Sequence, residues 1–192
     1  MQITDAYTFA ELSPRAQDWV RRRYTELDYE WWDTTLEDVV HVAVLLGLDM
    51  LVTKTGRDIS WDQYFNVTYK AAYGPPKESP STAVREYAPQ DEDLHAIADQ
   101  LTTAQVTAKL QHGECVTGNV TDHYSRDMYA NLWVDGVDLW DKDYNLWHDF
   151  FITFKDFASW IGKQLEAEYD YLTSDEHIKD MELKFDESGD EL

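Results

Sequence analysis

Residues 59–73 read ISWDQYFNVTYKAAY, and this stretch decides the fold class. Apart from Gln63, its odd-numbered positions carry apolar or aromatic side chains: Ile59, Trp61, Phe65, Val67, Tyr69, Ala71 and Tyr73. The even-numbered positions between them are mostly polar. A period of two is typical of an antiparallel strand that buries one face and leaves the other in water. The stretch therefore predicts a strand with its odd-numbered side chains buried, and its length leaves a break or a hairpin inside it open.

Helices are expected on both sides of this strand. Apolar residues recur at helical spacing in four segments, which begin near Ser13, Thr35, Pro89 and Thr153. The last of these should run to about residue 172 and be followed by a short helix that Ser174 caps. A short strand competes for residues 105–111, but the helix is preferred because its period starts upstream and continues through them.

The remaining segments complete an α+β pattern. Two further strands are expected at 114–121 and 127–134, and residues 135–149 are interpreted as an acidic, aromatic loop. The sum is a small antiparallel β-sheet of about three strands flanked by helices. We expect one domain over residues 1–192, in which residues 186–192 are a candidate disordered tail.

The charge is strongly negative and uneven along the chain. The 192 residues contain 16 Lys and Arg against 38 Asp and Glu, which gives a formal net charge of −22. Residues 91–192, the acidic C-terminal half, carry a net charge of −17. The 8 Trp, 12 Tyr and 7 Phe argue against a disordered acidic protein, which has few aromatic residues. The acidity argues against direct nucleic-acid binding and against binding to an anionic membrane.

The motifs of common catalytic and metal sites are not found. Residues 141–149 resemble the start of a calcium loop, but Leu146 and Ile152 stand where the glycine and the bidentate acid belong. No zinc pattern fits the spacing of the candidate ligands His112, Glu114, Cys115 and His123. No glycine-rich phosphate loop is present. We therefore predict no catalytic residue, no metal and no cofactor, and a protein that is not an enzyme.

The acidic residues suggest a surface for a partner. Like charges four residues apart on a helix, as at Glu166 and Asp170, destabilise it by about 0.2–0.5 kcal/mol. Few Lys or Arg residues lie nearby, a pattern expected where a basic partner neutralises the carboxylates. The predicted partner-binding residues are Asp138, Asp141, Asp143, Glu166, Asp170 and Glu176, with Trp140 and Trp147 as anchors.

Three segments carry a resemblance to a known group of proteins. They are YTFAELS at 7–13, EYAPQDEDLH at 86–95 and QLEAEYDYLTSDE at 164–176. In this order they resemble a family of uncharacterised accessory proteins of tailed bacteriophages, sometimes labelled antitoxin-like. The resemblance implies an accessory protein that acts inside the infected bacterium, in its cytoplasm.

Three functions remain open. The first is an acidic phage protein that inhibits a host defence or DNA-processing protein by imitating the charge of nucleic acid, since a rigid array of carboxylates can offer a comparable field. The second is an antitoxin-like neutraliser that binds a protein without mimicry. The third is an enzyme that acts on a small molecule or a nucleotide signal. The expected partner is a host protein with a basic, nucleic-acid-binding surface, and the oligomeric state stays open.

Overall fold

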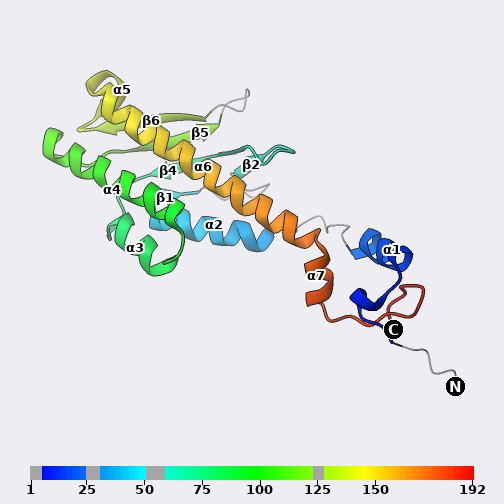
Figure 1. Cartoon of the computed structure of the whole chain (residues 1–192). Helices are drawn as coiled ribbons and strands as arrows, with labels where there is room; N and C mark the ends of the chain where they lie inside the picture. The colour runs from blue at the N-terminus through cyan, green and yellow to red at the C-terminus, as the bar shows by residue number, and fades with distance from the viewer. Residues whose placement is uncertain (1–5, 25–30, 51–58, 123–127) are drawn as a thin grey trace. The chain divides into compact units, whose positions relative to one another are not determined.

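The computed structural model describes residues 6–24, 31–50, 59–122 and 128–192 (Figure 1). The chain divides into two compact units. The larger unit comprises residues 36–164, and the smaller one comprises residues 1–35 together with 165–192. Both α-helices and antiparallel strands are present, so the predicted α+β class is confirmed. The expectations of one domain and of a disordered tail at 186–192 stay predictions.

The sheet of the larger unit has more strands than the sequence predicted. Its five antiparallel strands follow the order β1-β4-β5-β6-β7. Their bounds are Leu48–Asp49, Ala71–Tyr73, Thr117–Asp122, Met128–Val134 and Val137–Asp138. A separate two-stranded sheet pairs β2, Ile59–Trp61, with β3, Val67–Tyr69. The expectation of about three strands was wrong because short edge strands such as β1 and β7 are too brief to show a period of two.

The stretch 59–73 forms three strands in place of one. A turn separates β2 from β3, because the Asp62 carboxylate accepts hydrogen bonds from the backbone N–H groups of Tyr64 and Asn66. Phe65 in this turn has a positive φ of 56° and is only half-buried, so it is not the core residue that the period predicted. The predicted burial of the odd-numbered residues is confirmed for Ile59, Val67, Tyr69, Ala71 and Tyr73.

Three of the four longer helices of the larger unit correspond to predicted segments, and the one at 80–87 was not predicted. The four are α2, Asp33–Leu45; α3, Pro80–Tyr87; α4, Glu92–His112; and α6, Tyr144–Leu172, whose residues from 165 onward belong to the smaller unit. The Asp91 carboxylate caps α4 by accepting from the N–H of Leu94, and Gly113 ends it in the left-handed conformation. The helix continues through residues 105–111, so the competing strand does not form there.

The predicted loop at 135–149 was wrong. These residues form β7, the short helix α5, Leu139–Lys142, and the first turns of α6. Leu146 and Phe150 are buried and extend the apolar face of α6 toward its N-terminus, so the helix starts well before Thr153. Thr153, near which the helix was predicted to begin, lies inside α6. Its side chain is buried, and its hydroxyl donates to the Asp149 carbonyl.

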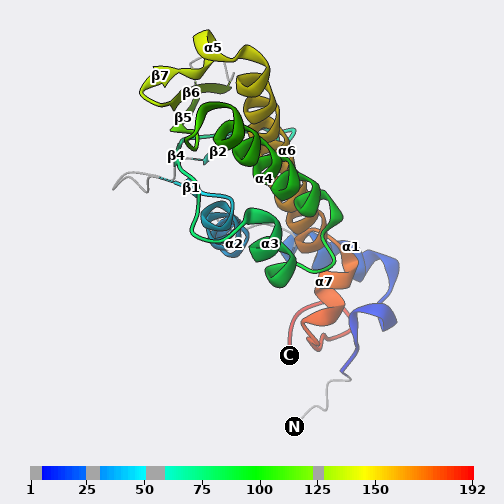
Figure 2. The ribbon, with the colours of Figure 1, turned by 90° about the vertical axis from the view of Figure 1, so that its left-hand side faces the viewer.

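Aromatic side chains join α6 to the strands. The Tyr73 ring lies 5.0 Å from the Phe154 ring, and the Tyr69 ring lies 5.6 Å from that of Phe157. The buried Tyr69 hydroxyl donates to the Phe154 carbonyl at 3.1 Å. Helices α4 and α6 lie side by side (Figures 1 and 2), and the Trp160 indole N–H of α6 donates to the Asp91 carboxylate at 2.8 Å. The core of the larger unit therefore lies between α6 and the strands.

Helix α6 also comes close to the β2–β3 turn, at Gly162. A Cβ atom at this position would lie 2.4 Å from the Phe65 carbonyl oxygen. Gly to Ala in a helix normally stabilises by about 1 kcal/mol. Here we expect Gly162→Ala to lower the free energy of unfolding by about 1–3 kcal/mol, because the turn must move away. Urea denaturation measures the change. Gly74→Ala is the control, since nothing lies within 4 Å of a Cβ there; an equal response of the two variants would contradict the close approach.

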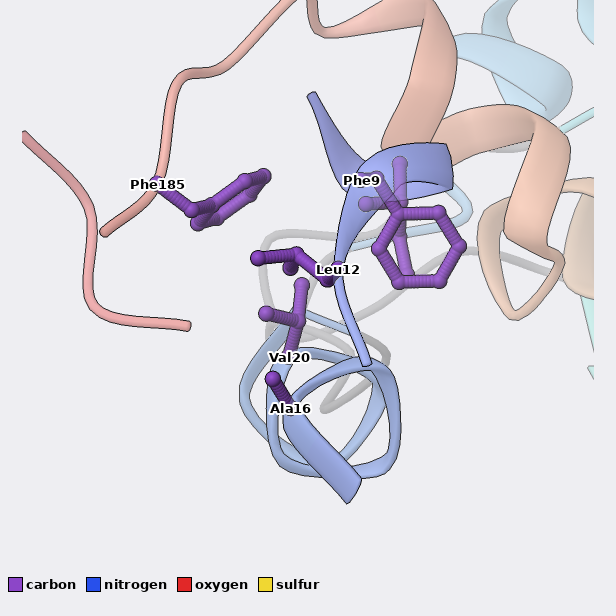
Figure 3. Close-up of a cluster of buried hydrophobic side chains, with 6 residues drawn as sticks. Phe9, Leu12, Ala16, Val20 and Phe185 are labelled. Carbon is purple, nitrogen blue, oxygen red and sulfur yellow. The ribbon is translucent and has the colours of Figure 1, made fainter. Parts of the chain in front are cut away.

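The smaller unit has its own hydrophobic core. It contains the 3-10 helix η1, Phe9–Glu11; α1, Pro14–Tyr24; and α7, Asp175–Asp180. Six buried side chains form the core: Phe9, Leu12, Ala16, Val20, Ile178 and Phe185. All of them except Ile178 are labelled in Figure 3. The predicted helix start at Ser13 and the predicted cap Ser174 are confirmed, since their side chains accept hydrogen bonds from the N–H groups of Ala16 and His177.

Backbone pairing and an ion pair connect the N-terminal and C-terminal segments of the smaller unit. Tyr7 and Phe185 exchange backbone hydrogen bonds of 2.8 and 2.9 Å. Arg21 of α1 donates from Nε and Nη2 to the two carboxylate oxygens of Asp175, at 2.6 and 2.8 Å. This hydrogen-bonded guanidinium lowers the pKa of the Asp175 carboxyl. The contact is partly exposed, so its contribution to stability is modest.

Candidate functional site

Two of the predicted carboxylates cap helices. The Asp138 carboxylate accepts from the N–H of Trp140 at 2.9 Å and starts α5. The Asp143 carboxylate accepts from the N–H of Leu146 at 3.1 Å and starts α6. Asp143 is also half-buried, and its Oδ2 lies 3.3 Å from Nε2 of His112 at the end of α4. Both carboxylates therefore have a structural role that the sequence prediction did not assign to them.

Four aromatic rings follow one another along α5 and the start of α6. We call Trp140, Tyr144, Trp147 and Phe151 the aromatic ladder. The Trp140 ring lies 4.5 Å from that of Trp147 and 4.8 Å from that of Tyr144, both edge to face. The rings of Trp147 and Phe151 stack at 4.9 Å. These geometries are the favourable ones for aromatic pairs, so the rings hold each other in place.

The ladder is anchored at one ring and exposed at two others. The Trp147 indole N–H donates to the Ala130 carbonyl of β6 at 3.0 Å. Trp140 is 49% exposed and Tyr144 is 50% exposed. The predicted anchors Trp140 and Trp147 are thus brought together, whereas Tyr144 and Phe151 were missed. Their spacing of three and four residues around Trp147 on α6 is the signal that indicates a shared helical face.

The segment that carries the ladder is acidic. Residues 135–151 contain five aspartates and one lysine, a net charge of −4. The lysine, Lys142, pairs with Asp135 at 3.7 Å. Asp141 and Asp149 are exposed, and neither side chain forms an ion pair with another residue in the described part of the chain. This leaves two carboxylates available to an external cation.

The other three predicted residues belong to the smaller unit. Glu166 and Asp170 lie one turn apart on α6, Glu176 lies in α7, and all three are exposed. Five of the eight predicted residues therefore lie at α5 and the start of α6, and their role in binding a partner stays a prediction. The assignment of the other three to the same partner stays a prediction.

The candidate zinc ligands can be located only in part. Cys115 is half-buried, and His112 contacts Asp143. His123 lies outside the described residues. Among the residues that the structure describes, no three His, Cys, Asp or Glu side chains come together as metal ligands. The calcium-like segment 141–149 lies mostly in α5 and α6, so its oxygens do not follow a calcium loop.

The family of the chain follows from a match over most of its length. Residues 31–175 match the family described as Domain of unknown function (DUF8835). The chain belongs to this family. No curated protein and no solved structure matches it. The DUF8835 region includes α2 to α6, both sheets and the whole aromatic ladder. The family's description names no source, so the resemblance to bacteriophage accessory proteins stays a prediction.

The described residues of this DUF8835 protein also form a groove and an open cleft. A groove of about 210 Å³ on α4 and α6 is lined by Asp93, Trp160 and Lys163, and the ammonium of Lys163 lies 2.6 Å from the Asp93 carboxylate. An open cleft of the smaller unit is lined by Arg15, Trp19 and the turn at 186–190. None of the helices in the described ranges is both long and apolar enough to cross a membrane.

Proposed function

We propose that this DUF8835 protein is an acidic binding protein that occupies the basic surface of a host defence or DNA-processing protein in place of nucleic acid. The observation that carries the proposal is the exposed Asp141, which directly follows the half-exposed Trp140 in the chain, together with the half-exposed ring of Tyr144. Fixed carboxylates attract a basic groove over long range, which raises the rate of encounter. Exposed aromatic rings then provide anchors that lose water in the complex.

The aromatic ladder favours a second candidate as well. An antitoxin-like neutraliser that binds mainly through apolar contacts would also use exposed rings, and its affinity would change little with salt. The enzyme alternative has less support at this site. Acid–base catalysis needs a desolvated carboxylate, and Asp141 and Asp149 are exposed to solvent.

A capture experiment separates these candidates. The full chain is immobilised and exposed to bacterial lysate, and bound proteins are released first by duplex DNA and then by rising salt. Two matched columns carry the acid-pair variant, Asp141→Lys with Asp149→Lys, and a control variant, Glu78→Lys with Glu86→Lys. Both control residues are exposed, and both variants change the net charge equally.

The proposal expects DNA-binding proteins that duplex DNA releases, with reduced capture on the acid-pair column only. Proteins that resist both DNA and salt would favour the neutraliser without mimicry. Equal capture by the acid-pair and control columns would contradict the assignment of the site.

A further inference from the structure

Two rings of the aromatic ladder are exposed to solvent. Trp147 is fixed by its hydrogen bond to β6 and by stacking on Phe151. Trp140 and Tyr144 remain about half in water although the chain buries many other large side chains. Large aromatic rings exposed together are frequent at binding sites, where Trp and Tyr supply much of the energy.

The other end of the ladder already holds a cation of the chain. The Lys155 ammonium lies 5.7 Å from the centre of the Phe151 ring, within the range of a cation–π interaction. Among the described residues, no Lys or Arg lies over the rings of Trp140 or Tyr144. Asp141 follows Trp140 directly and has no cationic partner there. The exposed end thus combines aromatic rings with a free carboxylate and lacks only the cation.

The same chain shows which cation suits this combination. In the smaller unit the Arg21 guanidinium lies 5.5 Å from the Phe9 ring centre while it binds both oxygens of Asp175. A guanidinium can do both because it is planar, weakly hydrated and forked, whereas an ammonium is a compact, strongly hydrated point charge. The sequence has no arginine after position 126, so residues 128–192 offer none of their own to the ladder.

We infer that the exposed end of the ladder binds arginine side chains of a basic protein segment, with the guanidinium on Trp140 or Tyr144 and paired with Asp141. The inference rests on the proposed function and deepens it, since it names the side chain that the site selects. Charge complementarity identifies the occupant, because the net charge of −4 over residues 135–151 disfavours nucleic acid and lipid headgroup phosphates.

Peptide binding to the full chain tests the inference. Capped octaarginine, octalysine and a neutral glycine–serine octamer are titrated by calorimetry at about 50 mM and about 200 mM salt. We expect octaarginine to bind about two- to fivefold more tightly than octalysine, the range of a surface cation–π contact. Trp140→Ala should remove this preference and leave the salt dependence unchanged, and Trp140→Phe should restore part of it.

Trp19→Ala is the matched control, because Trp19 is 52% exposed and belongs to the smaller unit. It should keep the preference for octaarginine. Equal affinity of the wild type for the two cationic peptides would overturn the inference and leave the proposed function standing. An unchanged preference in Trp140→Ala would overturn the role of the ladder. If neither cationic peptide binds more tightly than the neutral one, the proposed function itself fails.

Discussion

Replacing Phe154 with alanine is expected to lower the free energy of unfolding by about 3–5 kcal/mol. The Phe154 side chain is fully buried on α6. Its ring packs edge to face against Tyr73 at 5.0 Å, and it also lies 6.2 Å from the ring of Phe150. Truncation removes the buried surface and leaves a cavity that a helix packed against strands cannot fully close. Urea denaturation followed by far-ultraviolet circular dichroism measures the loss.

Phe151→Ala is the matched control on the same helix. Phe151 is half-buried and belongs to the ladder, so its removal should cost clearly less than that of Phe154. A Phe154→Ala variant that loses less than about 1 kcal/mol would contradict the position of the core between α6 and the strands.

The apolar face of α6 shows how far the sequence could predict the fold. Phe154, Phe157, Ile161 and Leu165 recur at helical spacing and are all buried, so the central and C-terminal turns were predictable. The N-terminal turns of α6 could not be predicted from the sequence, because the acidic and aromatic residues at 135–149 were interpreted as a loop. Their helical state depends on Asp143 as a cap and on the burial of Phe150 against Tyr73, a contact distant in sequence.

The candidate site could be predicted only in part for the same reason. The local density of acids and tryptophans indicated the segment around Trp140 and Trp147. Which carboxylates remain available depends on distant neighbours: Asp143 contacts His112 of α4, whereas Asp141 does not. Likewise, the break in the stretch 59–73 depends on the side chain of Asp62 turning back to its own backbone, which alternation of apolar residues does not reveal.

Reversing the charge of Asp141 and Asp149 together is expected to slow association with a basic partner roughly tenfold at low salt. Asp141 directly follows the exposed Trp140, so a lysine there would repel the partner at the point of contact, and a lysine at the exposed Asp149 would reduce the attraction of α6 further. The melting temperature should change little, because both side chains are exposed and neither caps a helix. Charge reversal at Asp143 would not test association alone, since the Asp143 carboxylate also caps α6.

The central claim is that these carboxylates guide a cationic partner to the aromatic ladder. Stopped-flow measurement of the association rate with octaarginine, over a series of salt concentrations, tests it most directly. The account predicts a steep fall of the rate with salt for the wild type and for Glu78→Lys with Glu86→Lys, and a slower, flatter dependence for the acid-pair variant. Superimposable salt curves for the acid-pair and control variants would contradict it.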